Sequence, residues 1–102
     1  MIRATTPTHV FTFPYDISPA ECTRILITYA QGRQIMLEFE KDELTIDGQN
    51  VSHKFTQEEA NVFSAMKKAE IQIRILMDGG EALASNVITV KVDDVLNDEV
   101  LV

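Results

Sequence analysis

Carboxylate side chains are concentrated in one short stretch of the sequence, at Glu38, Glu40, Asp42 and Glu43. Clustered carboxylates bind calcium in some proteins and serve as a general acid and base in others. A calcium loop, however, needs oxygen ligands at defined positions around a glycine turn, and that spacing is absent here. The alternation of Glu38 with Glu40 indicates instead the solvated face of a β-strand. We therefore predict neither a metal site nor a catalytic pair of carboxylates at this stretch.

Two histidines and one cysteine are the other side chains able to bind a metal or act as a nucleophile. A catalytic thiol needs a basic partner beside it, and nothing in the spacing brings Cys22 close to either histidine. Cys22 opens an apolar segment, so we predict a packed or edge thiol. His53 lies on the same face of its predicted strand as the apolar residues. We therefore expect His53 to be a core or edge residue whose hydrogen bonds are satisfied. His9 stands at a strand entry, and we expect it to be solvated.

The sequence offers no further motif for catalysis, because it contains no glycine-rich phosphate loop, nucleophile elbow or Cys-x-x-Cys pair. We expect the chain not to be an enzyme and to bind no cofactor. Its net charge of −7 argues against nucleic acid and anionic membranes as partners, because both require clustered Lys and Arg. The first residues lack the apolar segment of a signal peptide, and no window reaches the length of a membrane span. Synthesis in the cytoplasm is therefore expected.

Alternating apolar and polar residues predict β-strands along most of the chain. The clearest strand covers 69–77, where Ile71, Ile73 and Ile75 share one face. In the segment 34–40, the same parity predicts that Ile35, Leu37 and Phe39 face inward. The other predicted strands cover 8–15, 22–30, 43–46, 50–55 and 88–92.

Turn residues separate these strands. Asp47-Gly48 is a strong hairpin signal, and Asp78-Gly79-Gly80 tolerates the positive φ that a reversal requires. Pro14 removes one backbone donor, which indicates that the first strand lies at the edge of a sheet or is bulged near its end.

One short helix is predicted, from Gln57 to about Met66. Thr56 and Glu59 have the spacing of a capping box, in which each side chain accepts a hydrogen bond from a backbone N–H of the first turn. Phe63 or Met66 would then close one end of the hydrophobic core.

The length of 102 residues is that of a single domain, residues 1–102, with one modest core. About seven short antiparallel strands, with one short helix in a crossover, predict an all-β fold of the immunoglobulin-like β-sandwich type. The Cys–Trp–Cys core of antibody domains is absent, because the chain has one cysteine and no tryptophan. A small barrel is the alternative architecture.

The C-terminal segment, Asp93–Val102, mixes acidic and apolar residues beyond the last predicted strand. Its apolar side chains have no clear place in a seven-strand core. They either fold back on the same domain or dock on another subunit. We expect protein–protein contacts to be made by Val95, Leu96, Val100 and Leu101.

Several motifs between Thr56 and Val100 carry a family resemblance. In order they are Thr56-Gln57-Glu58-Glu59, Glu70-Ile71-Gln72-Ile73-Arg74, Asp78-Gly79-Gly80, Ala84-Ser85, and Val92 with Val95-Leu96-Asn97-Asp98-Glu99-Val100. In them the chain resembles small proteins from the tail modules of siphophages and prophages of Gram-positive bacteria. It is also similar to the N-terminal immunoglobulin-like domain of phage baseplate upper proteins. The resemblance is looser before Thr56.

What the resemblance implies is a non-enzymatic structural or assembly protein of a phage or prophage tail or baseplate. Its partners would be other tail or baseplate proteins, or further copies of itself, and its destination would be the virion. Baseplate upper proteins continue beyond this domain toward a receptor-binding part, whereas this sequence runs to Val102. A free-standing accessory, assembly or decorating subunit is therefore expected.

Two other functions remain open from the residues alone. The first is a ligand-binding sandwich of the carbohydrate-binding type, although such sites display exposed aromatic side chains, and here tryptophan is absent and most Phe and Tyr residues fall on inward parity. The second is a small regulator of a host protein, for which the acidic charge would suit a basic target.

Overall fold

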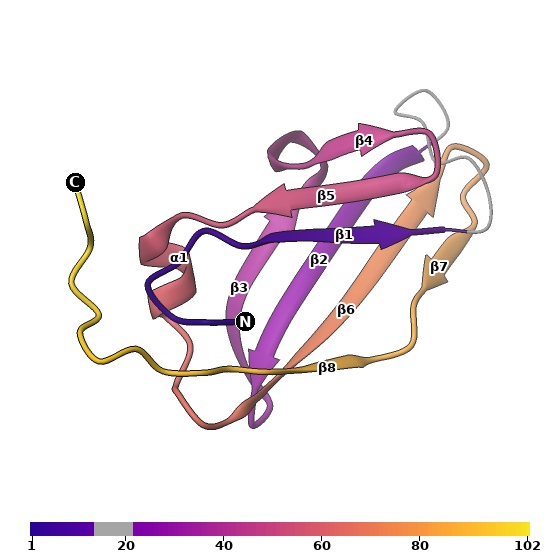
Figure 1. Ribbon diagram of the computed structural model, residues 1–102. Helices are drawn as coiled ribbons and strands as arrows, with labels where there is room; N and C mark the ends of the chain where they lie inside the picture. Colours follow the sequence, from indigo (N-terminus) through magenta and orange to yellow (C-terminus); the bar gives the residue numbers. More distant parts are fainter. Residues whose placement is uncertain (14–21) are drawn as a thin grey trace.

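A computed structural model describes residues 1–13 and 22–102, and these residues are mostly β-strand (Figure 1). The elements are β1 (Thr8–Thr12), β2 (Cys22–Gln31), β3 (Gln34–Glu40), a 3₁₀ turn (Lys41–Glu43), β4 (Thr45–Asp47), β5 (Asn50–Lys54), α1 (Gln57–Asn61), β6 (Lys68–Met77), β7 (Ala82–Ala84) and β8 (Ile88–Lys91). Within the described residues, no helix has the length or hydropathy needed to cross a membrane.

The strands form two sheets that pack face to face (Figure 1). One sheet has the order β1–β5–β4, and the other has the order β3–β2–β6, with both β7 and β8 pairing along the outer side of β6. Ile2 adds a parallel bridge to Asp93, just after β8. This order corresponds to strands B, E and D of an immunoglobulin domain facing strands C′, C, F and G. The fold is an immunoglobulin-like β-sandwich, as predicted, and not a closed barrel.

The hydrophobic core lies between the two sheets, and the predicted buried face of β6 is confirmed. Alternate residues of β2, from Ile25 to Tyr29, pair with alternate residues of β6, from Ile75 to Ile71, and all of them are buried. Their neighbours in sequence point to the outer face. The other large side chains that are fully buried are Val51, Phe55, Phe63 and Val92.

The helix α1 has the predicted start but is much shorter than predicted. The capping box is present, because the Glu59 N–H donates to Thr56 Oγ1 at 3.1 Å and the Thr56 N–H donates to Glu59 Oε1 at 2.9 Å. Phe63 is buried and closes one end of the core, as expected. Met66 does not: its side chain is 77% exposed, its φ is 64°, and its N–H donates to the Val92 carbonyl. The helix ends at Asn61, and by Met66 the backbone already pairs with Val92, just after β8.

The prediction that Ile35 faces inward is wrong, and its side chain is 57% exposed. The cause is a bulge between the paired strands, since Tyr29 pairs with Leu37 whereas Ala30 pairs with Ile35. The extra residue on β3 is Met36, which packs against the core in place of Ile35. A bulge shifts the parity of every residue beyond it.

Two strand boundaries also differ from the prediction. The first strand, expected over 8–15, ends at Thr12, and the expected contribution of Tyr15 lies outside the described residues. An additional strand, β7, follows the Asp78-Gly79-Gly80 reversal and pairs with residues 74–76 of β6. Its sequence, Ala82–Ala84, lacks the β-branched residues that mark strands.

Candidate functional site

The C-terminal segment lies beside α1, at the opposite end of the molecule from β7 (Figure 1). The Gln57 side chain donates to the Leu101 carbonyl at 2.8 Å and accepts the Leu101 N–H at 2.7 Å. The Asn61 side chain donates to the Asp98 carbonyl at 3.0 Å. In this structure the segment therefore rests on its own domain, through polar contacts.

The apolar side chains of the segment gain little from this placement. Leu96 and Val102 are fully exposed and Leu101 is 74% exposed, while Val95 and Val100 are half-buried. The predicted contact residues thus lie at or near the surface, outside the main core. Exposed apolar side chains gathered on one segment are the usual sign of a surface that another chain covers.

The ionic contacts that hold the segment are also on the surface. The Arg3 guanidinium lies 3.0 Å from an Asp94 oxygen and 3.1 Å from an Asp98 oxygen, and both aspartates are about half exposed. The Val95 N–H, and then Arg3, lower the pKa of the Asp94 carboxyl. Exposed ion pairs contribute little to stability. In addition, Arg3 Nε and Asn61 Oδ1 are buried without a hydrogen-bond partner among the described residues. The contacts that hold the C-terminal segment on the domain therefore contribute little free energy.

A cluster of aromatic rings fills one end of the core, and His9 belongs to it. His9 Nδ1 lies 2.7 Å from the Tyr29 hydroxyl, and its ring stacks on Tyr29 and contacts Phe55. The prediction of a solvated His9 is therefore wrong. Its parity on β1 matches that of Phe11, so the side chain points between the sheets and not to solvent.

His53 is a satisfied core-edge residue, as predicted. Its ring stacks on Phe39 at a centroid distance of 3.9 Å, and Nε2 lies 3.2 Å from Glu59 Oε1. Glu59 also caps α1, so His53 ties the helix to the core. Among the described residues, no group of three or more His, Cys, Asp or Glu side chains is placed to hold a metal ion.

The environment of His9 predicts that acid destabilises the fold. Burial, the nearby N-terminal amino group and His53 lower the pKa of His9. The folded state then binds the proton less readily than the unfolded state, in which the imidazole has its ordinary pKa of about 6.5. This contribution to stability is complete above that value and is lost as the pH falls from it through the lower pKa of the folded state. Urea unfolding at a series of pH values should show a decline below about pH 6.5, and His9→Gln should reduce that decline.

The carboxylates near residue 40 have separate structural partners. Glu40 forms two hydrogen bonds with the Arg24 guanidinium, which lowers the pKa of Glu40. Glu43 caps the 3₁₀ turn through the Glu40 N–H, and Glu38 accepts from the Thr28 hydroxyl. These side chains do not converge on a common point. Cys22 is a buried thiol, as predicted.

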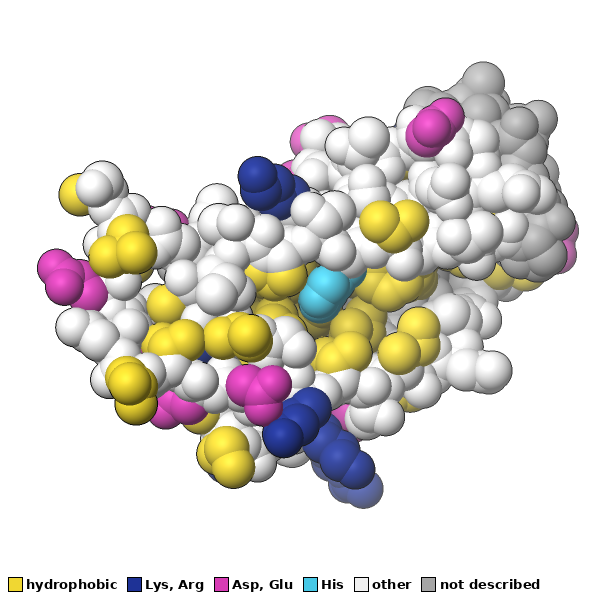
Figure 2. Space-filling model, in the orientation of Figure 1, with side chains coloured by type: hydrophobic (Ala, Val, Ile, Leu, Met, Phe, Trp, Pro, Cys, Tyr) yellow, Lys and Arg dark blue, Asp and Glu magenta, His cyan; other side chains and the backbone are white. Residues whose placement is uncertain are grey.

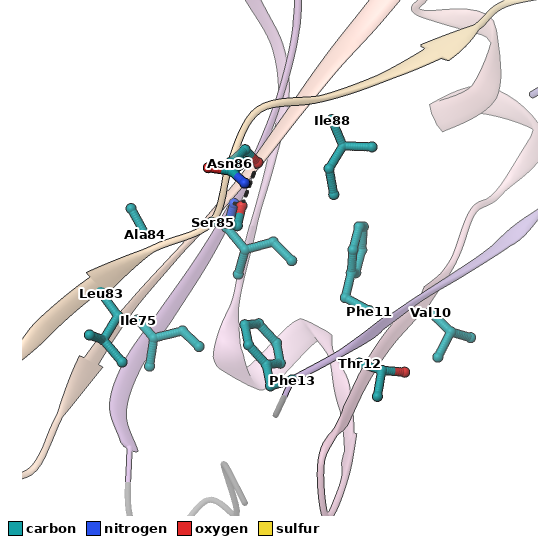
Figure 3. Close-up of a pocket in the computed structure, with 11 residues that line it drawn as sticks. Val10, Phe11, Thr12, Phe13, Ile75, Leu83, Ala84, Ser85, Asn86 and Ile88 are labelled. Carbon is teal, nitrogen blue, oxygen red and sulfur yellow. Dashed lines mark hydrogen bonds between the residues drawn. The ribbon is translucent and has the colours of Figure 1, made fainter. Parts of the chain in front are cut away.

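An apolar groove of about 530 Å³ opens between the edge of β1 and the edge formed by β7 and β8 (Figure 3). Phe11 and Phe13 reach into it from β1 and meet Ile88 and Leu83 from the other edge. Figure 2 shows hydrophobic side chains gathered around a histidine in a hollow on this face. The full lining is Val10, Phe11, Thr12, Phe13, Ile73, Ile75, Leu83, Ala84, Ser85, Asn86 and Ile88.

This groove was not predicted from the sequence. One signal pointed to it, since Pro14 indicates an edge strand, and β1 is indeed at the edge of its sheet. The opposite wall depends on β7, whose sequence does not indicate a strand. The groove and the C-terminal segment are the two surfaces on which a protein contact can be built.

Comparisons with known proteins add little to this geometry. No family model matches the chain, and no curated protein matches it. A similar solved structure is the V domain of amphioxus IgVJ-C2. It aligns with a TM-score of 0.37 and 9% identity, over 90% of this chain and 96% of that chain. No function is transferred from a likeness of this size.

Proposed function

We propose that this chain is a non-enzymatic structural or assembly protein of a phage or prophage tail or baseplate, and that it acts through protein–protein contacts. The observation that supports a binding role is the C-terminal segment. Its residues Leu96, Leu101 and Val102 are exposed to solvent, although burial of each would contribute about 1.5 to 3 kcal/mol. The contact residues in this proposal are Val95, Leu96, Val100 and Leu101.

The assignment to a phage tail rests on the sequence resemblance and not on the fold, because immunoglobulin-like sandwiches serve many unrelated functions. Glu40, Glu43, Glu59 and both histidines are engaged in helix capping, ion pairing and core packing, and the proposal assigns them no catalytic role.

The direct test is mass spectrometry of purified particles induced from the source strain. If the chain is a structural virion protein, its peptides should be present at a constant ratio to known tail proteins. An assembly factor would be expressed on induction but absent from intact particles. Absence from the particles, together with failure to bind any tail protein during assembly, would contradict the proposal.

Deletion of Asp94–Val102 tests the role of the segment itself. The truncated chain should remain folded, because the contacts that it loses are exposed and mostly polar. It should bind tail proteins more weakly than the full chain does. Circular dichroism and a pull-down with the tail proteins check the two expectations. A truncated chain that unfolds would show that the segment belongs to the core.

A further inference from the structure

The outer edge of β1 has no partner strand among the described residues. On its inner side, the Phe13 N–H donates to the Gln49 carbonyl at 2.8 Å. Backbone groups alternate in direction along an antiparallel ladder. The N–H and C=O groups of Thr8, Val10 and Thr12 therefore point away from β5, toward the groove side of the sheet.

Between Pro7 and Pro14, this edge lacks the charged side chains that usually protect an exposed strand. Natural sheets place charged side chains or prolines along their edges to prevent pairing with other chains. The segment Thr8–Thr12 contains no charged residue, although the whole chain has a net charge of −7. Among the other edge strands, β3, β4 and β8 carry charge at Glu38, Asp47 and Lys91, whereas β7 is uncharged but has only three residues. The five-residue β1 is therefore the longer of the two uncharged edges and the more open to an additional strand.

The groove has the shape and chemistry for alternate side chains of such a strand. A strand added to β1 would direct every second side chain between Phe11 and Phe13 on one wall and Ile88 and Leu83 on the other (Figure 3). None of the described residues that line the groove is charged. The strand should therefore be uncharged and apolar where it enters the groove.

The C-terminal segment has these properties. Val100-Leu101-Val102 is an uncharged apolar run that follows the acidic Asp98-Glu99. In an extended conformation, Val100 and Val102 share one face and could enter the groove, while Leu101 would lie on the outer face next to the exposed Val10. The uncharged side chains of this run match the uncharged lining of the groove, and pairing that begins at Val100 leaves Asp98 and Glu99 outside it.

The segment of the same molecule is not placed to fill this groove. Residues 1–3 lie beside 91–93: the Asp93 N–H donates to the Met1 carbonyl and the Arg3 N–H donates to the Asp93 carbonyl. This N-terminal stretch runs between β1 and β8 and separates the start of the C-terminal segment from the groove (Figure 1). The segment of a second molecule can approach the groove from its open side, and in an extended conformation it reaches about 30 Å.

We infer that residues 100–102 of one copy add to the edge of β1 of a second copy and insert Val100 and Val102 into its groove. The inference deepens the proposed function, because it assigns both surfaces of a protein contact. The two surfaces differ, so the contact is head-to-tail and produces a ring or an open chain of copies. Such repetition suits a subunit of an assembly.

The test is the association of the purified full chain, measured by sedimentation velocity over a wide concentration range. Wild-type protein should associate as its concentration rises. Val10→Lys and Val102→Asp should each weaken association by more than about tenfold, since one places a charge on the edge and the other places a charge in the groove. Ile35→Lys is the matched control, because Ile35 is also on an edge strand and is 57% exposed, against 58% for Val10. It should associate like the wild type.

Mixing the two weakened variants gives a sharper result. The Val10→Lys chain keeps an intact segment and the Val102→Asp chain keeps an intact groove, so the mixture should form one-to-one complexes that neither forms alone. A wild type that stays monomeric at every concentration, or a mixture that stays monomeric, would overturn the inference. Loss of association in Val10→Lys but not in Val102→Asp would also overturn it, and would point to symmetric pairing of two β1 edges.

These outcomes are separate from those of the particle experiment. Self-association can fail while the chain is found in particles, which would leave the tail role intact and remove only this contact. It can also succeed while the chain is absent from particles, which would keep the contact and remove the tail role.

Discussion

Ile73→Asp is expected to leave the chain unfolded. Ile73 is 2% exposed, lies in the middle of β6 and pairs directly with the buried Ile27 of β2. An ionised carboxylate at this position would lose its hydration without gaining a cationic partner, which costs several kcal/mol. A domain of this size is stable by only about 5 to 15 kcal/mol in total. The variant should therefore show the circular dichroism of an unfolded chain at ordinary temperature.

Arg74→Asp is the matched control, one residue further along the same strand. Arg74 is exposed on the outer face of the sheet, and the same new carboxylate would remain in water. Its free energy of unfolding should change by no more than about 0.5 kcal/mol. Equal destabilisation by the two substitutions would mean that the buried face of β6 is wrongly assigned.

Phe55→Ala should give the second largest loss of stability. The Phe55 ring is 1% exposed and lies within 5.0 to 6.2 Å, between ring centroids, of its neighbours in the aromatic cluster. Those neighbours come from both sheets and from the residues after α1, so the removal of the ring would leave a cavity where they meet. Truncation of a buried phenylalanine to alanine costs about 3 to 5 kcal/mol. Urea unfolding of the purified variant measures this loss. The neighbours are His9, Tyr29, Phe39, His53 and Phe63.

Tyr29→Phe probes the same cluster without making a cavity. It removes only the hydroxyl group that lies 2.7 Å from His9 Nδ1, and should cost about 1 kcal/mol. If the two variants lose similar stability, then the hydrogen bond and not the packing of Phe55 would hold this end of the core together.

The main sheet could be predicted from the sequence because the parity of its residues is regular. Ile71, Ile73 and Ile75 alternate with polar residues over an unbroken strand, and only one side of the sheet is covered, so alternation alone determines which face is buried. The capping box at Thr56 was predictable for a similar reason, since it depends on residues three positions apart.

The errors arise where contacts distant in sequence override local pattern. Ile35 faces outward because a bulge in the pairing with β2 changes the parity, and the bulge is not visible in the sequence of β3. Met66 lies beyond the end of α1, and its N–H pairs with the Val92 carbonyl. His9 is half-buried because β1 packs its inner face against Tyr29, which is twenty positions away.

The candidate interaction surface could be predicted only in part. The apolar residues of the C-terminal segment stand out because no strand pattern accommodates them, and Leu96 and Leu101 are indeed exposed. The groove could not be predicted, because its walls come from strands that are distant in sequence and one of them, Ala82–Ala84, has no strand-forming residues.

The break between β7 and β8, at residues 85–87, affects which insertions and deletions this fold tolerates. At the interruption, Ser85 keeps the ladder to β6 closed: its N–H donates to the Ile73 carbonyl at 2.8 Å, and its hydroxyl oxygen accepts the Ile73 N–H at 3.0 Å. The position of β8 is thus fixed locally and does not depend on the turn at residues 78–81. Insertions or deletions in that turn can shift β7 without moving the buried Val92. Related sequences can therefore differ in length at this turn while the sandwich stays the same.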